Sequence, residues 1–319
     1  MRGTVRKRGG GMLTMIHRTR NPGVFGCSKS EIPLASGTPW GRQLSSRNST
    51  LIRPALQLRE TLNRRSCVKD NVRKNVSSND YQHHESEVLK HFLESPIPDG
   101  ELLENLFMFL TPQHMRRLFF WYELYQEIVD VPGCIMQFGV RWGRDMAAWE
   151  ALRTTFEPFN HSRKVIGFDT FEGFVGTDEK DGAHEMIQEG NFATTSGYEE
   201  RLHDYLRHRE SLSPLGHVQK FELHKGDACK TLPAYLDAHP ETVVSLVHFD
   251  MDIYKPTVEC LKMLKPYLTK GSIVVLDEAV CPAFPGETVA LKEVFDLSSI
   301  RLKRHPKVGP TWPAYFVIE

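Results

Sequence analysis

Short apolar runs alternate with helix-patterned segments from Val131 to the C-terminus. A chain with this alternation places its strands in a mostly parallel sheet and its helices on both faces of that sheet. We therefore expect an α/β fold with a doubly wound, mostly parallel, seven-stranded sheet that ends in a hairpin-like pair. The expected strands are residues 134–138, 164–168, 218–224, 243–249, 272–276, 300–304 and 315–318, and the expected helices are 144–156, 197–209, 231–239, 256–268 and 287–295.

The first 75 residues differ in composition from the rest of the chain. They hold 16 Lys and Arg against 3 Asp and Glu, and because the whole chain is neutral, the remainder carries the opposite excess. This segment offers too little apolar surface to offset the entropy of ordering, so we expect a disordered basic tail over 1–75. It suits a transit peptide, a segment that binds an anionic partner, or an extension without function.

The sequence pattern over residues 76–130 predicts a helical cap, which precedes a ligand-binding domain over 131–319. Helices are expected at 84–94, at 101–110 and from Thr111 to Ile128, where Thr111 is the N-cap and proline follows it. The last of these helices carries an aromatic stripe, and such a stripe is more often core than ligand site. The stripe consists of Leu118, Phe119, Trp121, Tyr122 and Tyr125.

The cysteine spacing and the hydropathy of the chain bear on the compartment in which the protein is expected. The six cysteines, at positions 27, 67, 134, 229, 260 and 281, have no metal-site or redox spacing, so we expect reduced, buried thiols and a cytoplasmic protein. No apolar stretch approaches the roughly 18–20 residues that span a bilayer. We expect a homo-oligomer with a small-molecule substrate and neither a membrane nor a nucleic-acid partner.

Ligands of doubly wound sheets bind beyond the carboxyl ends of the strands. After the first expected strand, Gly139, Val140 and Gly143 form a turn in which the backbone can approach a ligand at a helix N-terminus. This motif lacks the third glycine of a dinucleotide fingerprint, so an ordinary strand-to-helix turn explains it equally well.

The second and third expected strands each end at an aspartate. Asp169, followed by Thr170, suits a carboxylate that accepts from both hydroxyls of a nucleoside ribose. Asp227 suits an acceptor for an adenine amino group, with the backbone N–H of Ala228 donating to the ring. Either aspartate is equally explained as a helix cap or part of a turn.

Four acidic residues follow the fourth and fifth expected strands. Asp250 and Asp252 follow one strand and Asp277 and Glu278 the other, so the four are expected in one crevice. Their charges would repel strongly unless a cation or protons neutralised them. Oxygen-rich ligation favours Mg²⁺, Ca²⁺ or Mn²⁺ over zinc.

At this point the chain resembles a known family. The segments His248 to Tyr254 and Gly167 to Gly173, together with the pair Asp277-Glu278, look like the macrocin O-methyltransferase family over roughly residues 85–319. The loop motifs at 181–182 and 190–192 and the turn at 285–287 extend the likeness. The chain departs from the family pattern at three places. Gln137 stands where an acidic residue is common before the Gly-Val pair, and Arg141-Trp142 inverts the usual Trp-Arg order. Glu278 stands where many members of the family have a second aspartate.

The resemblance implies a class I, Rossmann-like methyltransferase that uses S-adenosylmethionine and Mg²⁺ to methylate hydroxyls, typically on natural-product sugars. The sulfonium methyl is electrophilic, so an in-line hydroxyl must lose its proton, and a bound Mg²⁺ would make that hydroxyl more acidic. We assign Asp250, Asp277 and Glu278 to the metal and Asp252 to the general base, with His248 in reserve. The helical cap and the loop 174–198 are expected to cover the site.

Three other functions fit parts of the pattern. Asp250-x-Asp252 after an apolar strand is the signature of haloacid-dehalogenase-type phosphatases, although there it normally opens the domain. Asp169 fits an NAD-dependent oxidoreductase, which the missing third glycine disfavours. The third alternative is a non-catalytic scaffold that retains the nucleotide-binding fold, and intact carboxylates at both strand ends oppose it.

Overall fold

A computed structural model describes residues 79–305 and 313–319, all of which belong to one compact unit, Ser66–Glu319. The predicted tail over 1–75 lies outside the described residues. The strands form one seven-stranded sheet in the order β3-β2-β1-β4-β5-β7-β6. β1 to β5 are parallel, and β7 runs antiparallel to both β5 and β6. The predicted doubly wound α/β fold is confirmed.

The alternation of strands and helices follows the sequence closely. The strands are β1 (Cys134–Phe138), β2 (Val165–Asp169), β3 (Phe221–Lys225), β4 (Val244–Phe249), β5 (Leu268–Leu276), β6 (Lys303–Arg304) and β7 (Ala314–Val317). The α-helices are α2 (Asn79–Leu93), α3 (Pro112–Ile128), α4 (Arg144–Phe156), α5 (Tyr198–Glu210), α6 (Ala228–Ala238), α7 (Tyr254–Leu264) and α8 (Gly286–Val294), with 3₁₀ turns η1 (Asp99–Glu101), η2 (Leu106–Phe109), η3 (Glu179–Asp181) and η4 (Lys265–Tyr267).

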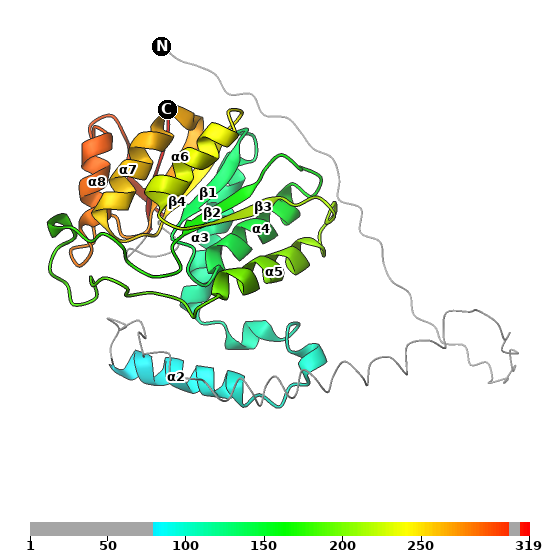
Figure 1. Cartoon of the computed structure of the whole chain (residues 1–319). Coiled ribbons are helices and arrows are strands. Elements are labelled where there is room, and N and C mark those ends of the chain that lie inside the picture. The colour runs from blue at the N-terminus through cyan, green and yellow to red at the C-terminus, as the bar shows by residue number, and fades with distance from the viewer. Residues whose placement is uncertain (1–78, 306–312) are drawn as a thin grey trace, which may run out of the picture. The chain divides into compact units, whose positions relative to one another are not determined.

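Helices cover both faces of the sheet (Figure 1). On one face, α6, α7 and α8 bury a cluster that includes Leu232, Leu261 and Leu291 against the strands. On the other face, α3, α4 and α5 bury a second cluster that includes Trp121 and Trp149. The central strands β1 and β4 are buried over their whole length, as expected for parallel strands enclosed by two helical layers.

Helix α3 belongs to the second of these helical layers. It begins after Thr111, whose backbone N–H donates to His114 Nδ1 at 3.0 Å. The expected core stripe is only partly right: Trp121 and Tyr125 are buried, whereas Phe119 and Tyr122 are 51% and 42% exposed. The buried face also carries residues outside the expected stripe, because the helix turns a slightly different side to the sheet. These are Phe120, Leu124 and Ile128.

Several expected elements differ from the structure. The helix predicted at 101–110 is instead turns and the short η2, because its apolar residues find little to pack on: Leu103, Phe107 and Met108 are all exposed. The third strand begins at Phe221 rather than at 218, and the sixth has two residues. No helix in the described ranges is long and apolar enough to cross a membrane. Of the six cysteines, Cys134, Cys229, Cys260 and Cys281 are free thiols, and the other two lie outside the described residues.

Candidate active site

A cavity of about 390 Å³ lies at the carboxyl ends of the parallel strands. This volume is in the range of small-molecule and cofactor sites. Ten of the twelve residues predicted for the site line it, and Gly143 and His248 do not. The ten are Gly139, Val140, Asp169, Thr170, Asp227, Ala228, Asp250, Asp252, Asp277 and Glu278.

The glycine turn after β1 is required by a close backbone approach. A Cβ on Gly139 would lie 1.9 Å from the carbonyl oxygen of Asp250, so no side chain fits between the turns after β1 and β4. In the structure, glycine is therefore needed at position 139 because the backbones of these two turns pack directly on each other. Gly143, at the N-cap of α4, faces Leu202 of α5 and does not line the cavity.

Asp169 joins the two neighbouring turns on the β1 and β2 side of the cavity. Its Oδ2 accepts from the backbone N–H groups of Val140 and Arg141 at 2.6 and 2.7 Å, and its Oδ1 accepts from Phe171 N–H at 2.5 Å. Burial raises the pKa of Asp169 above its ordinary value, although these three donors oppose the change. Since a carboxylate offers about four acceptor positions, one remains for a ligand hydroxyl.

Asp227 caps helix α6, as one of the two interpretations predicted. Its Oδ1 accepts from Cys229 N–H at 3.0 Å, while the residue also lines the cavity beside Ala228. Thr170 donates its hydroxyl to the Gly173 carbonyl at 2.9 Å and so stabilises the turn after β2.

An arginine that the sequence did not indicate lies behind the acidic residues of the cavity and is not part of the cavity lining. Arg117 of α3 binds Asp145, at the start of α4, through two hydrogen bonds of 3.1 and 2.7 Å. Its Nη2 also lies 3.3 Å from Asp250 Oδ2 and 2.9 Å from Asp277 Oδ1. One guanidinium therefore contacts carboxylates at the ends of β4 and β5 and on α4. Positive charge at this position offsets the repulsion that we expected among the acidic residues.

Burial and Arg117 separate the acidities of the two strand-end aspartates. Burial and the neighbouring charge of Asp277 raise the pKa of Asp250 to about 6, although Arg117 opposes the change. Burial also disfavours ionisation of Asp277, but Arg117 and His248 outweigh it and hold the pKa of Asp277 below its usual range. In this arrangement Asp277 is the ionised member of the pair and Asp250 the more readily protonated one.

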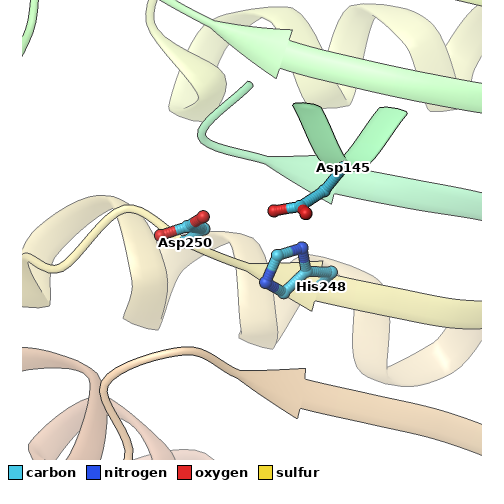
Figure 2. Close-up of side chains that lie close together, drawn as sticks. All are labelled: Asp145, His248 and Asp250. Atoms are coloured by element: carbon cyan, nitrogen blue, oxygen red, sulfur yellow. The ribbon is translucent and has the colours of Figure 1, made fainter. Parts of the chain in front are cut away.

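His248 lies behind the cavity rather than in it. Its ring is fully buried, packs 4.6 Å from the Trp121 ring, and places Nε2 3.4 Å from Asp277 Oδ1. One ligand atom each from Asp145, His248 and Asp250 lie within 4.8 Å of one another, which is a geometry that can hold a metal ion. Figure 2 shows these side chains meeting from α4 and from the end of β4. Buried in this way, His248 is not positioned to take a proton from an acceptor.

Asp252 follows β4 and Glu278 follows β5, and both line the cavity. Glu287 of α8 is buried and accepts hydrogen bonds from the backbone of the two turns that carry these residues. Its Oε1 accepts from Met251 N–H and Asp252 N–H at 3.3 and 3.2 Å, and its Oε2 accepts from Glu278 N–H at 3.0 Å. Asp252 has φ of +62°, a left-handed conformation that is uncommon outside glycine and is found at functional sites.

The loop after β2 supplies the apolar wall of the cavity through Phe174, Met186 and Phe192, and Phe284 adds to it from the segment before α8. The expectation that the 174–198 loop borders the site is met in this respect. Among the described residues, the helices over 79–130 supply none of the cavity lining, so the predicted cap contributes through Arg117 behind the acidic residues.

Comparison with known proteins gives the family. No protein-family model matches the sequence, and no curated protein matches it. A solved structure of CalS11, a calicheamicin methyltransferase, is 40% identical, covers 76% of this chain and 93% of CalS11, and superposes with a TM-score of 0.74. The apo structure of CalS11, named there as a TDP-rhamnose 3'-O-methyltransferase, is 39% identical over 76% of this chain and 95% of CalS11, with a TM-score of 0.67.

The chain belongs to the CalS11 family of S-adenosylmethionine-dependent O-methyltransferases. For this methyltransferase, the phosphatase, oxidoreductase and non-catalytic alternatives are therefore set aside. Two residues of its acidic centre, Arg117 and Asp145, escaped the sequence analysis. Asp145 stands two residues after Gly143 of the glycine turn, which was a usable signal, whereas Arg117 lies in a helix whose aromatic residues suggested only core packing.

Proposed function

We propose that this methyltransferase transfers a methyl group from S-adenosylmethionine to a hydroxyl of a small-molecule acceptor, a sugar of a natural product, with the help of Mg²⁺. The observation that carries the proposal is the 40% identity to CalS11 over nearly the whole of that enzyme. CalS11 is named for a rhamnose hydroxyl. The motifs that resemble macrocin O-methyltransferases support the same class of acceptor.

The β1 and β2 side of the cavity suits S-adenosylmethionine. Asp169 presents its carboxylate there with one acceptor position left for a ribose hydroxyl, and Asp227 and Ala228 border the position proposed for adenine. When bound, S-adenosylmethionine supplies an electrophilic methyl group on a sulfonium. The protein's part is to hold the acceptor oxygen in line with that methyl, which lowers the entropic cost of the reaction.

The acidic side of the cavity suits a divalent cation. Asp250, Asp277 and Glu278 all line the cavity and offer the oxygen donors that Mg²⁺ prefers. We favour this set over the group that includes His248, because His248 is fully buried and lies outside the cavity lining. A Mg²⁺ held there would lower the pKa of the acceptor hydroxyl.

The acceptor proton must pass to a group on the cavity wall. Asp252 is our candidate base, because it lines the cavity on the turn between β4 and α7. The apolar wall formed by Phe174, Met186 and Phe192 would pack on the acceptor and exclude water from the reacting oxygen.

An activity screen tests the proposal. Purified enzyme with S-adenosylmethionine and Mg²⁺ is offered TDP-rhamnose, other sugar nucleotides, glycosides and simple phenols, and S-adenosylhomocysteine release is measured together with the product mass. We expect a mass increase of one methyl group on a sugar-containing acceptor. Turnover confined to phenols would contradict the assignment of a sugar hydroxyl. Cofactor binding without turnover of any acceptor in the panel would also contradict the proposed class of acceptor.

A further inference from the structure

We infer that Glu287 is a positioning residue that fixes the turns bearing Asp252 and Glu278 relative to each other, and that Asp181 fixes the first of these turns at its C-terminal end, through Tyr254. Neither side chain is among the residues that line the cavity. The inference rests on the proposed role of Asp252 as the base, and it concerns the orientation of the site rather than proton transfer itself.

Glu287 connects two turns that belong to different strands. It is fully buried at the start of α8, and its two oxygens accept three backbone hydrogen bonds, two from Met251 and Asp252 after β4 and one from Glu278 after β5. A buried carboxyl group is costly unless its acceptor positions are used, so this arrangement is favourable only with all three donors in place. The position of one turn is thereby tied to the position of the other.

The turn after β4 needs such support because its backbone is in an uncommon conformation. Asp252 has φ of +62°, a conformation that is unfavourable for a residue other than glycine and persists only where the surroundings enforce it. The Asp252 N–H donates to Glu287 in this conformation. Glu287 therefore favours the backbone geometry that presents Asp252 to the cavity.

Asp181 holds the other end of the same turn. It is fully buried in η3, its Oδ1 accepts from Tyr254 N–H, and its Oδ2 accepts from Asp178 N–H at 2.7 Å. A Cβ on Gly286 would lie 2.4 Å from Asp181 Oδ1, so the start of α8 packs directly on this carboxylate. Asp181 lies within the loop that supplies Phe174, Met186 and Phe192 to the cavity. The loop that contacts the acceptor is thus linked to the turn that carries the base.

The chemistry of the side chain gives a matched test. Glu287→Gln keeps the shape but replaces one acceptor oxygen with an NH₂ donor that must face a backbone N–H. We expect faster hydrogen exchange at the amides of 251–252 and 278, a loss of about tenfold to a hundredfold in kcat with TDP-rhamnose, and S-adenosylmethionine affinity close to wild type. Glu150→Gln is the control, because Glu150 is also buried but bonds Arg209 and does not line the cavity.

Asp181→Asn provides an independent variant should Glu287→Gln fail to fold. It should lower kcat and also raise KM for the acceptor, since Asp181 belongs to the loop that borders the acceptor. Unchanged exchange and unchanged kcat in the folded Glu287→Gln, or unchanged kcat in Asp181→Asn when only that variant folds, would overturn the inference. Loss of kcat in step with loss of S-adenosylmethionine binding would also overturn it, because that result indicates general disruption.

Asp252→Asn separates this inference from the proposed function. If Asp252→Asn retains turnover, the proposed base is wrong, whatever Glu287 does. If Asp252→Asn loses turnover while Glu287→Gln keeps it, the base assignment stands and the positioning role of Glu287 fails. The hydrogen-exchange measurement requires no acceptor, so it tests the connection between the turns even where the acceptor assignment is wrong.

Discussion

Arg117 on α3 donates a hydrogen bond from Nη1 to Oδ2 of Asp277 at the end of β5 at 3.2 Å, and its Nη2 forms an ion pair with Asp277 Oδ1 at 2.9 Å. The same guanidinium contacts Asp145 and Asp250. The arginine is only 10% exposed, so these contacts are made largely away from water. A helix on one face of the sheet thus supplies a positive charge that is shared by acidic residues from three separate elements.

Removal of this charge should destabilise the metal-free enzyme. Arg117→Met leaves Asp145, Asp250 and Asp277 without their shared partner, and loss of one member of a buried ion pair typically costs about 3–5 kcal/mol. Thermal unfolding in EDTA should show a clear drop in Tm, and added Mg²⁺ should recover part of it by binding the carboxylates that have lost Arg117. Arg207→Met is the control, since Arg207 pairs with Asp204 on the exposed surface of α5 and should contribute about 1 kcal/mol or less. Equal Tm values for the two variants would contradict the central role of Arg117.

Stability of the metal-free enzyme should fall as pH rises across the titration of Asp250. Its folded pKa is raised to about 6 by burial and by Asp277, so the folded state retains a proton that the unfolded chain loses near pH 4. The proton-linked stability is therefore complete below about pH 4 and is lost as pH rises through about 6, an effect of the order of 1–3 kcal/mol. Denaturant unfolding in EDTA at several pH values, compared with Asp250→Asn, isolates this change. Parallel profiles for the two proteins would show that Asp250 titrates normally.

Asp169→Ala should weaken S-adenosylmethionine binding by about tenfold to a hundredfold, since it removes a charge-assisted acceptor worth roughly 1.5–3 kcal/mol. It also frees the backbone N–H groups of Val140 and Arg141, so the turn after β1 loses its support. Calorimetric titration of S-adenosylmethionine measures the loss. Asp204→Ala, on exposed α5 surface, should bind normally. A folded Asp169→Ala protein with wild-type affinity would remove Asp169 from the cofactor site.

The basic segment should be dispensable for catalysis. Composition alone motivates this expectation, because residues 1–75 combine a strong positive charge with little apolar surface. Limited proteolysis should leave a stable core that starts near residues 75–85, and a variant lacking residues 1–75 should keep the Tm and kcat of the full chain. A substantial loss of either would show that the segment supports the folded enzyme.

The sequence predicted those features that depend on periodicity and on strand ends. Buried parallel strands read as apolar runs, and their carboxyl ends meet at one edge, so Asp169, Asp250 and Asp277 were placed at the cavity from the sequence alone. Arg117 could not be found in this way, because its role depends on how α3 packs across the sheet. The buried position of His248 has a similar cause, since the face on which a side chain of an all-apolar strand lies is not encoded by alternation.

Methyl transfer in the presence and absence of Mg²⁺ tests the central claim most directly. Enzyme is treated with excess EDTA and assayed with S-adenosylmethionine and a sugar acceptor, Mg²⁺ is then restored, and Mg²⁺ binding to wild type and to Asp277→Asn is measured by calorimetry. We predict that EDTA abolishes turnover while S-adenosylmethionine binding persists, that Mg²⁺ restores turnover, and that Asp277→Asn binds Mg²⁺ weakly because a neutral amide replaces a charged oxygen donor. Full activity in excess EDTA would contradict the metal mechanism and indicate a methyltransferase that relies on Arg117 and its carboxylates alone.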